Sequence, residues 1–144
     1  MSAVERYASG SPYEASVGFS RAVRIGDRLI TSLTAPLMPG GAPPPAGTEA
    51  QWRRCLAIFD EVLRAAGGTL ADVVRTEVHY TAEADVDAID RLHFEQFGAV
   101  RPVTKMLPVA GLAEPGWLLE LEIEAVLQPA GARPPDGRER RPAA

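Results

Sequence analysis

Apolar and polar positions alternate along several stretches of the chain, and this alternation predicts β-strands with one buried face. The pattern is longest in residues 117–127, where every second side chain is apolar and Glu120, Glu122 and Glu124 occupy the opposite face. Gly26-Asp27, between two β-like runs, is typical of a hairpin turn. The predicted strands are residues 20–25, 28–35, 73–80, 103–109 and 117–127.

Two other segments repeat apolar residues every three or four positions, which predicts amphipathic helices. The first begins at Thr48, which has Gln51 in the spacing of a capping box. Gly67-Gly68 follows the last apolar position and supplies a stop signal. The predicted helices are residues 48–66 and 84–97.

The order of the predicted elements, β-β-α-β-α-β-β, favours an α+β fold with one mixed sheet and two helices on one face. Strand 103–109 follows Pro102 and contains Pro108, so we expect it at a sheet edge, or its pairing to stop there, because proline lacks the N–H group. The face without helices lies either in solvent or against another subunit. The charged residues predicted on that face are Arg75, Glu77, His79, Glu120, Glu122 and Glu124.

The composition is that of one small soluble domain with an uneven distribution of charge. The chain has 144 residues, of which 46% are hydrophobic and 24% charged, and a formal net charge of −4. Residues 129–144 hold four arginines, two acids, four prolines and no large apolar side chain, which predicts a disordered tail of net charge +2. The predicted folded domain, residues 1–128, then carries −6. This acidic body argues against binding to nucleic acid or to an anionic membrane.

Cysteine and histidine are scarce, with one cysteine, Cys55, and two histidines, His79 and His93. These numbers exclude an intramolecular disulfide framework and a zinc site with several cysteines, and they argue against a closed zinc site while leaving a mixed carboxylate site open. No apolar run has the length of a transmembrane helix, and no signal peptide is recognisable. We therefore expect a cytoplasmic protein.

The row of Glu120, Glu122 and Glu124 is the first candidate for chemistry. Alternate residues of a strand stand about 7 Å apart, and acids this close raise one another's pKa. One of them could then exchange protons near neutral pH. A solvated strand face with cross-strand partners such as Arg75 explains the same pattern.

Arg21 lies two residues after Phe19, so both side chains point to the same face, and an arginine beside an aromatic ring can clamp a carboxylate. A surface ion pair is the alternative.

Lys105, the only lysine, shares a strand face with apolar residues, where it either acts as a nucleophile or extends to the sheet edge. His93 and Cys55 lie on apolar helix faces and are expected in the core or, for His93, at an interface.

Five motifs cover most of the predicted domain: VGFSRAVRIGDRLITS (17–32), AGGTLADVVRTEVHYT (66–81), the His-x-x-x-Phe-Gly helix end (93–98), RPVTKMLPVAGL (101–112) and LLELEIEAVL (118–127). In this order and spacing they resemble the YjgF-type Rid family of reactive-intermediate (enamine/imine) deaminases. The resemblance spans residues 16–128, and the motifs are specific as a set rather than singly.

The resemblance implies a chorismate-mutase-like α+β sheet and a homotrimer, with the sheets facing inward and one pocket at each subunit interface. It implies hydrolysis of a 2-imino or 2-enamino acid to a 2-keto acid and ammonia, without a metal or organic cofactor. In this family an arginine holds the substrate carboxylate and a glutamate helps to position the water. A ribonuclease label is sometimes attached to the family, but the acidic body disfavours RNA binding.

The motifs assign family positions to individual residues. The family glutamate falls on Glu122 in Glu-Ile-Glu-Ala, with Glu124 beside it, and the family's aromatic residue falls on Phe19, where the deaminases have tyrosine. The arginine of the Pro-Ala-Arg-Ser motif falls on Thr104, and the cysteine of many members falls on Met106. The chain therefore resembles a branch that lacks the catalytic arginine.

We expect Arg21 to replace the missing cation, Ser32 and Thr34 to offer small polar groups, and Leu33, where the family usually has glycine, to narrow the pocket. The favoured function is a Rid-like deaminase that acts on a small imine or enamine. The alternatives are a divergent enzyme of a catabolic or natural-product pathway and a non-catalytic trimer that binds small metabolites. The predicted site comprises Glu122 and Arg21 as catalytic residues and Phe19, Ser32, Thr34, Thr104, Met106 and Glu124 as substrate-binding residues.

Overall fold

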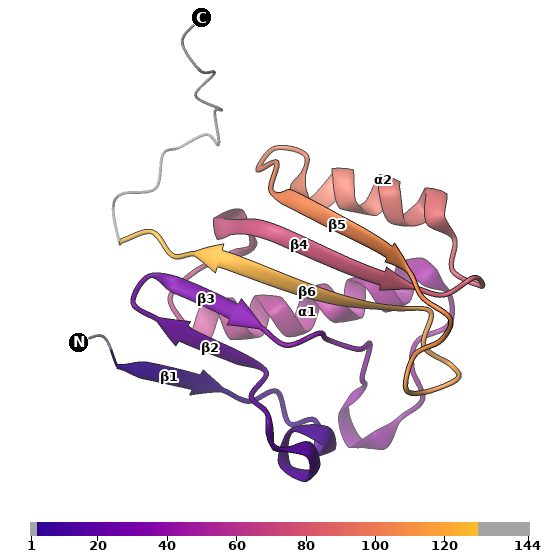
Figure 1. Cartoon of the computed structure of the whole chain (residues 1–144), viewed down its shortest axis with the longest axis horizontal. Coiled ribbons are helices and arrows are strands. Elements are labelled where there is room, and N and C mark those ends of the chain that lie inside the picture. Colours follow the sequence, from indigo (N-terminus) through magenta and orange to yellow (C-terminus); the bar gives the residue numbers. More distant parts are fainter. Residues whose placement is uncertain (1–2, 130–144) are drawn as a thin grey trace, which may run out of the picture.

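The computed structural model describes residues 3–129, which form a six-stranded sheet with two long helices on one face (Figure 1). The predicted α+β fold is confirmed, with one more strand than expected. The strands are β1 (Val4–Tyr7), β2 (Ala22–Ile25), β3 (Arg28–Thr31), β4 (Val73–Tyr80), β5 (Val103–Pro108) and β6 (Leu119–Val126); the helices are α1 (Thr48–Ala65) and α2 (Val86–Phe97). Shorter helical turns are Glu14–Gly18, Pro39–Gly41 and Leu70–Asp72.

The strand order in the sheet is β1-β2-β3-β6-β4-β5. Every neighbouring pair is antiparallel except β4 and β5, which run parallel. Parallel neighbours need a crossover connection, and α2 provides it between β4 and β5. The sheet therefore ends at β1 and β5, which confirms the predicted edge position of the strand after Pro102.

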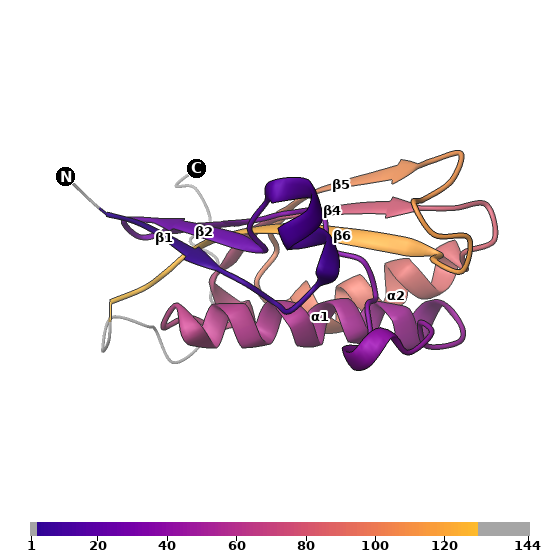
Figure 2. The same ribbon diagram turned by 90° about the horizontal axis from the view of Figure 1, so that it is seen from below.

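Alternation along β6 separates a buried face of the sheet from an uncovered one, and Figure 2 shows both helices on the same side. Leu119, Leu121 and Ile123 point toward the helices and are at most 2% exposed. Trp52 and Phe59 of α1 belong to the same buried apolar cluster. Burying one such side chain contributes about 1.5–3 kcal/mol. This packing fixes the glutamates of β6 on the face that the helices leave uncovered.

The sequence pattern does not predict β1, because no side chain of Val4–Tyr7 is fully buried and no apolar face repeats along it. Backbone pairing with β2 holds this strand in place, with Val4 opposite Ile25. The predicted hairpin at Gly26-Asp27 is confirmed, and Gly26 has the positive φ of 63° that the turn requires. β3 is shorter than predicted, and Thr34 adds a single bridge to Leu121 of β6.

The predicted capping box at the start of α1 is wrong. Gly47 is the N-cap residue and no side chain caps the helix. Thr48 Oγ1 instead accepts a hydrogen bond from the backbone N–H of Asp85, the N-cap of α2, at 2.9 Å. The Gln51 side-chain amide donates to the carbonyl of Gly116 at 2.9 Å. Both polar side chains therefore connect α1 to neighbouring segments.

Most of the predicted tail, residues 130–144, lies outside the described residues, and the boundary at residue 128 stays a prediction. Among residues 3–129, neither helix combines the length and the apolar character that crossing a membrane requires.

Candidate functional site

Glu124 is held by ion pairs on the uncovered face of the sheet. Its carboxylate bonds to Arg28 Nη2 at 2.5 Å and also contacts Arg75 Nη2. The Arg28 hydrogen bond is the main cause that lowers the pKa of Glu124, with Arg75 adding to it against the opposing effect of burial. The expectation that the three glutamates raise one another's pKa is therefore wrong for Glu124. The prediction that Arg75 is its cross-strand partner is confirmed.

Glu120 and Glu122 have no such partners. Within residues 3–129, neither carboxylate makes a hydrogen bond or an ion pair, although both side chains are partly buried. Burial is the main cause that raises the pKa of each group, and the facing carboxylate of Glu77 raises that of Glu122 further. The direction agrees with the sequence prediction, but its main cause is desolvation rather than repulsion within the row. A carboxylate of this kind can exchange protons closer to neutral pH.

Glu77 and Lys105 form a long-distance ion pair on the uncovered face of the sheet. Lys105 Nζ lies 3.9 Å from Glu77 Oε1, and the lysine side chain is 61% exposed. Glu77 also bonds to His79 Nε2 at 3.0 Å. Lys105 thus extends into solvent beside an acid, and the surroundings that would activate it as a nucleophile are missing among the described residues.

A cavity of about 210 Å³ lies at the end of the uncovered face, beside the helical turn Glu14–Gly18. We call it the aromatic cavity. The lining residues that matter below are Tyr13, Phe19, Arg21, Leu33, Trp117 and Glu120. The structure thus brings Phe19 and Arg21 together as predicted, with Leu33 beside them.

Arg21 is buried, and most of its guanidinium is already bound. Its Nε lies 3.2 Å from Glu14 Oε2 and 3.2 Å from Ser9 Oγ, and its Nη1 donates to Leu33 O at 3.2 Å and to Thr34 Oγ1 at 3.0 Å. Burial would raise the pKa of Glu14, but hydrogen bonds from Ser9 and the charge of Arg21 bring it below its ordinary value. Arg21 is therefore one half of an internal ion pair.

The hydroxyls of Ser32 and Thr34 are also satisfied within the chain. Ser32 Oγ donates to Ser20 O at 2.7 Å, and Thr34 Oγ1 donates to Ser32 O at 2.9 Å while accepting from Arg21. Thr34 is fully buried. Their observed contacts orient the loop after β3 and the guanidinium of Arg21.

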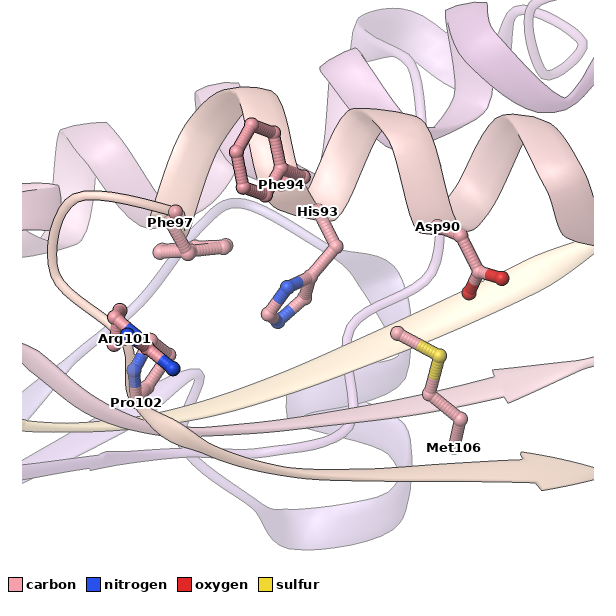
Figure 3. Close-up of a pocket in the computed structure, with 8 residues that line it drawn as sticks. Asp90, His93, Phe94, Phe97, Arg101, Pro102 and Met106 are labelled. Atoms are coloured by element: carbon pink, nitrogen blue, oxygen red, sulfur yellow. The ribbon is translucent and has the colours of Figure 1, made fainter.

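A second cavity, of about 540 Å³, lies between α2 and the edge strand β5 (Figure 3). We call it the α2–β5 cavity. Met106 points from β5 toward the helix, and Asp90 and His93 point from α2 back toward the strands. Thr104 shares the face of Met106, because it lies opposite Thr76, which is buried beneath the helices. Glu122 projects from the opposite face, so one subunit does not bring Thr104 or Met106 together with it.

A chain of hydrogen bonds links α2 to β5 beside this cavity. His93 Nε2 lies 2.7 Å from Thr76 Oγ1, which donates to Thr104 Oγ1 at 2.8 Å. Burial lowers the pKa of His93, with a smaller opposing effect from Asp90. The roles in the His93–Thr76 bond follow from the tautomer of the ring: with the Thr76 proton assigned to Thr104, Nε2 is assigned as the donor.

Sequence reasoning missed two polar residues of the α2–β5 cavity. His93 was expected in the core or at an interface, and Arg101 was not singled out, yet both line the cavity. Arg101 is the one described non-glycine residue with a positive φ, 53°. A left-handed backbone conformation is rare for an arginine that directly precedes a proline, and strained backbone of this kind concentrates at functional sites. The Arg101-Pro102 pair was the feature of the sequence that could have pointed to Arg101.

Comparison with known proteins identifies the family. The family model described as Endoribonuclease L-PSP matches residues 10–127 of the chain. The chain belongs to the YjgF/Rid family. Among solved structures, Rv2704 of Mycobacterium tuberculosis, a member of the YjgF/YER057c/UK114 family, is similar with a TM-score of 0.75 and 37% identity, covering 87% of this chain and 100% of that one.

Two relatives of this Rid-family chain are informative. The protein named "Uncharacterized protein SCO2049" of Streptomyces coelicolor is 38% identical over 127 residues, covering 85% of this chain and 92% of that protein. The 2-iminobutanoate/2-iminopropanoate deaminase of Escherichia coli is 30% identical over 116 residues, covering 78% and 88%. No group of three or more His, Cys, Asp or Glu side chains within the described part of the chain is arranged to hold a metal ion.

Proposed function

We propose that this Rid-family protein hydrolyses a small imine or enamine to a carbonyl compound and ammonia, with Glu122 as the acid/base group. The observation that carries the proposal is the partly buried Glu122 carboxylate on the uncovered sheet face, which has no ion-pair or hydrogen-bond partner among residues 3–129. The similarity to a protein named as a deaminase supports the reaction class. The family resemblance implies a 2-imino acid as substrate and a 2-keto acid as product, and the substrate set below tests this finer form against imines without a carboxylate.

The reaction needs a base and then an acid at one position. In the proposed sequence, Glu122 takes a proton from water while the water oxygen bonds to the carbon of the protonated imine. Glu122 returns the proton to nitrogen, the C–N bond breaks with its electron pair on nitrogen, and the hydroxyl proton leaves with ammonia as ammonium. A carboxyl group with a raised pKa suits both steps, because its two protonation states are closer in free energy near neutral pH.

The pocket is proposed to be completed by a second subunit of a homotrimer. Strand alternation separates Glu122 from Thr104 and Met106, which lie on opposite faces of one sheet. The α2–β5 cavity, however, opens at a sheet edge, where the face of a neighbouring subunit can meet it. In such an assembly Met106 and Thr104 of one subunit would approach the uncovered face of the next.

Ammonia release tests the proposed reaction. The full chain would be mixed with freshly generated 2-iminobutyrate, 2-aminoacrylate and N-unsubstituted imines of simple aldehydes (R–CH=NH), and ammonia would be measured against the spontaneous rate. We expect acceleration that falls by about 10²–10⁴-fold in Glu122→Gln. Glu61→Gln, which removes the same charge from an exposed position of α1, serves as the matched control. Equal rates for wild type and Glu122→Gln would refute the role of Glu122.

Non-catalytic binding of a small metabolite is the second candidate, and the occupied guanidinium of Arg21 favours it. A 2-imino acid needs a cation for its carboxylate, Thr104 stands at the family arginine position, and Arg21 is bound to Glu14. Binding without any acceleration of ammonia release across the substrate set would support this candidate. A divergent reaction of a catabolic or natural-product pathway predicts turnover of other substrates at the same Glu122.

A further inference from the structure

The aromatic cavity contains one charge that nothing in the described chain balances. Two charged side chains, Arg21 and Glu120, line it. The positive charge of Arg21 is offset by Glu14, whose Oε2 lies 3.2 Å from Arg21 Nε, and both side chains of this pair are at most 9% exposed. Glu120 makes no ion pair or hydrogen bond among residues 3–129. The net charge presented to a small molecule is therefore negative.

The other basic side chains near Glu120 bond to other acids. His79 lies opposite Glu120 in the pairing of β4 and β6, but its Nε2 bonds to Glu77 at 3.0 Å. Arg75 contacts Glu124, two pairs further along the same face. Burial raises the pKa of Glu120, with smaller opposing effects from His79 and Arg21. A desolvated carboxylate without a partner gains more from a bound cation than an exposed one does.

The walls of the cavity suit an organic cation with an apolar body. Tyr13 and Trp117 meet edge to face, with ring centroids 6.2 Å apart and an interplanar angle of 79°. Phe19 already carries a cation over its ring, because Arg21 Cζ lies 5.3 Å from the ring centroid. Leu33 adds an aliphatic surface. Aromatic faces attract ammonium and iminium groups, and the volume of about 210 Å³ restricts the occupant to a small molecule.

We infer that the aromatic cavity binds a small organic cation, an ammonium or iminium ion with a hydrocarbon body and no carboxylate, through Glu120 and the aromatic walls. Combined with the proposed function, on which this step rests, the substrate is an iminium ion without a carboxylate and without a substituent on nitrogen, R–CH=NH2+, rather than a 2-imino acid. Glu120 would hold it about 7 Å from Glu122, the next residue on the same face of β6. The same conclusion follows from position 104, where Thr104 stands in place of a carboxylate-binding arginine and already accepts a hydrogen bond from Thr76.

Binding of matched probes tests the inference. The full chain would be titrated with 3-methylbutylammonium, with leucine, which adds a carboxylate to the same carbon framework, and with 4-methylpentanoate, in which the charge is reversed. Nuclear magnetic resonance shifts of the cavity residues and calorimetry would report binding. We expect the ammonium ion to bind at least about tenfold more tightly than either carboxylate, the loss that one charged hydrogen bond accounts for. Equal or tighter binding of leucine or 4-methylpentanoate would overturn the inference.

Two variants add a test of the residue. Glu120→Gln keeps the shape of the side chain and removes its charge, so affinity for 3-methylbutylammonium should fall about tenfold. Glu61→Gln on the exposed face of α1 should leave it unchanged. Unchanged affinity in Glu120→Gln would overturn the role of Glu120. Where this variant does not fold, the preference of the wild type for 3-methylbutylammonium over leucine and 4-methylpentanoate decides the test.

Turnover separates this inference from the proposed function. Ammonia release would be measured for the N-unsubstituted imines that two-electron oxidation of 3-methylbutylamine and of leucine gives, because their hydrolysis yields ammonia with 3-methylbutanal or 4-methyl-2-oxopentanoate. Faster hydrolysis of the leucine-derived imine would refute the inference and leave the proposed reaction standing. Selective binding of 3-methylbutylammonium without hydrolysis of either imine would support the inference and refute the proposed reaction.

Discussion

Replacing Arg21 with methionine distinguishes an internal ion pair from a substrate clamp. Arg21 is 3% exposed and donates to Glu14, Ser9, Leu33 and Thr34. Removing one partner of a buried pair leaves the other charge without compensation, which costs about 3–5 kcal/mol. Since small domains are stable by only about 5–15 kcal/mol, Arg21→Met should lose a large share of the free energy of unfolding.

Urea denaturation at fixed protein concentration would measure this loss, because assembly makes stability depend on concentration. Glu14→Gln and the double variant complete a mutant cycle, in which we expect a coupling of about 1–3 kcal/mol between contacting residues. The amide oxygen of the glutamine can still accept the hydrogen bond from the Ser9 N–H. A loss below about 1 kcal/mol in Arg21→Met, or additive single variants, would refute an internal role.

The dependence of the free energy of unfolding on pH, measured at acidic pH, provides an independent check. The pKa of Glu14 lies below its ordinary value in the folded chain, so its contribution is complete above the pKa of the unfolded chain and disappears as pH falls through the folded value. Without Arg21 the burial of Glu14 remains, and the loss should begin at higher pH. Carboxylate ligands should bind wild type and a folded Arg21 variant equally, whereas a substrate clamp predicts weaker binding to the variant.

Three further predictions follow from burial and close contact. Burial raises the pKa of Glu122, so turnover that needs its ionised form should rise with pH over a range above the pKa of an ordinary glutamate. Glu122→Gln should abolish this rise in a pH–rate profile. A variant with the same profile as the wild type would contradict the prediction. Gly68→Ala places a Cβ against Leu127 Cδ2 in the packed interior and should lower the free energy of unfolding by about 1–3 kcal/mol in urea titrations. Gly111→Ala, whose Cβ meets nothing within 4 Å, should change it by less than about 0.5 kcal/mol. Burial raises the pKa of Cys55, so a disulfide reagent should label this thiol only after unfolding, and rapid labelling of the native protein would show the helix packing to be wrong.

The central part of the fold is predictable because burial leaves a mark in the sequence. In β6 the apolar residues Leu119, Leu121 and Ile123 are those that contact the helices, and the glutamates between them lie on the uncovered face. β1 leaves no such mark, because its backbone pairing with β2 needs no apolar side chain. The capping pattern at Thr48 misled because the same hydroxyl serves the start of another helix, a tertiary contact that spacing does not encode.

The site was predictable in its residues more than in its geometry. Alternation placed Arg21 and Phe19 on one face, and they do line one cavity. The partner Glu14 lies in a segment without periodicity, folded as a π-helical turn, so the ion pair could not be read from a pattern. The distance between Thr104 and Glu122 depends on the register of β4, β5 and β6, which sequence alternation alone leaves open.

That register also places the residues of the proposed site on opposite faces of a single chain. Thr104 lies opposite Thr76, and Thr76 lies opposite Ile123, so all three share the helix-covered face and Glu122 must take the other one. No side-chain rotation crosses a sheet, and the covered face opens to the outside at the α2–β5 cavity, beside the edge strand β5. At that edge Val103 is 68% exposed, an apolar side chain that a second sheet face would cover. The local strand pairing thus supports the proposal of a shared pocket, in which the acid/base group and the wall around Met106 come from different copies of the chain.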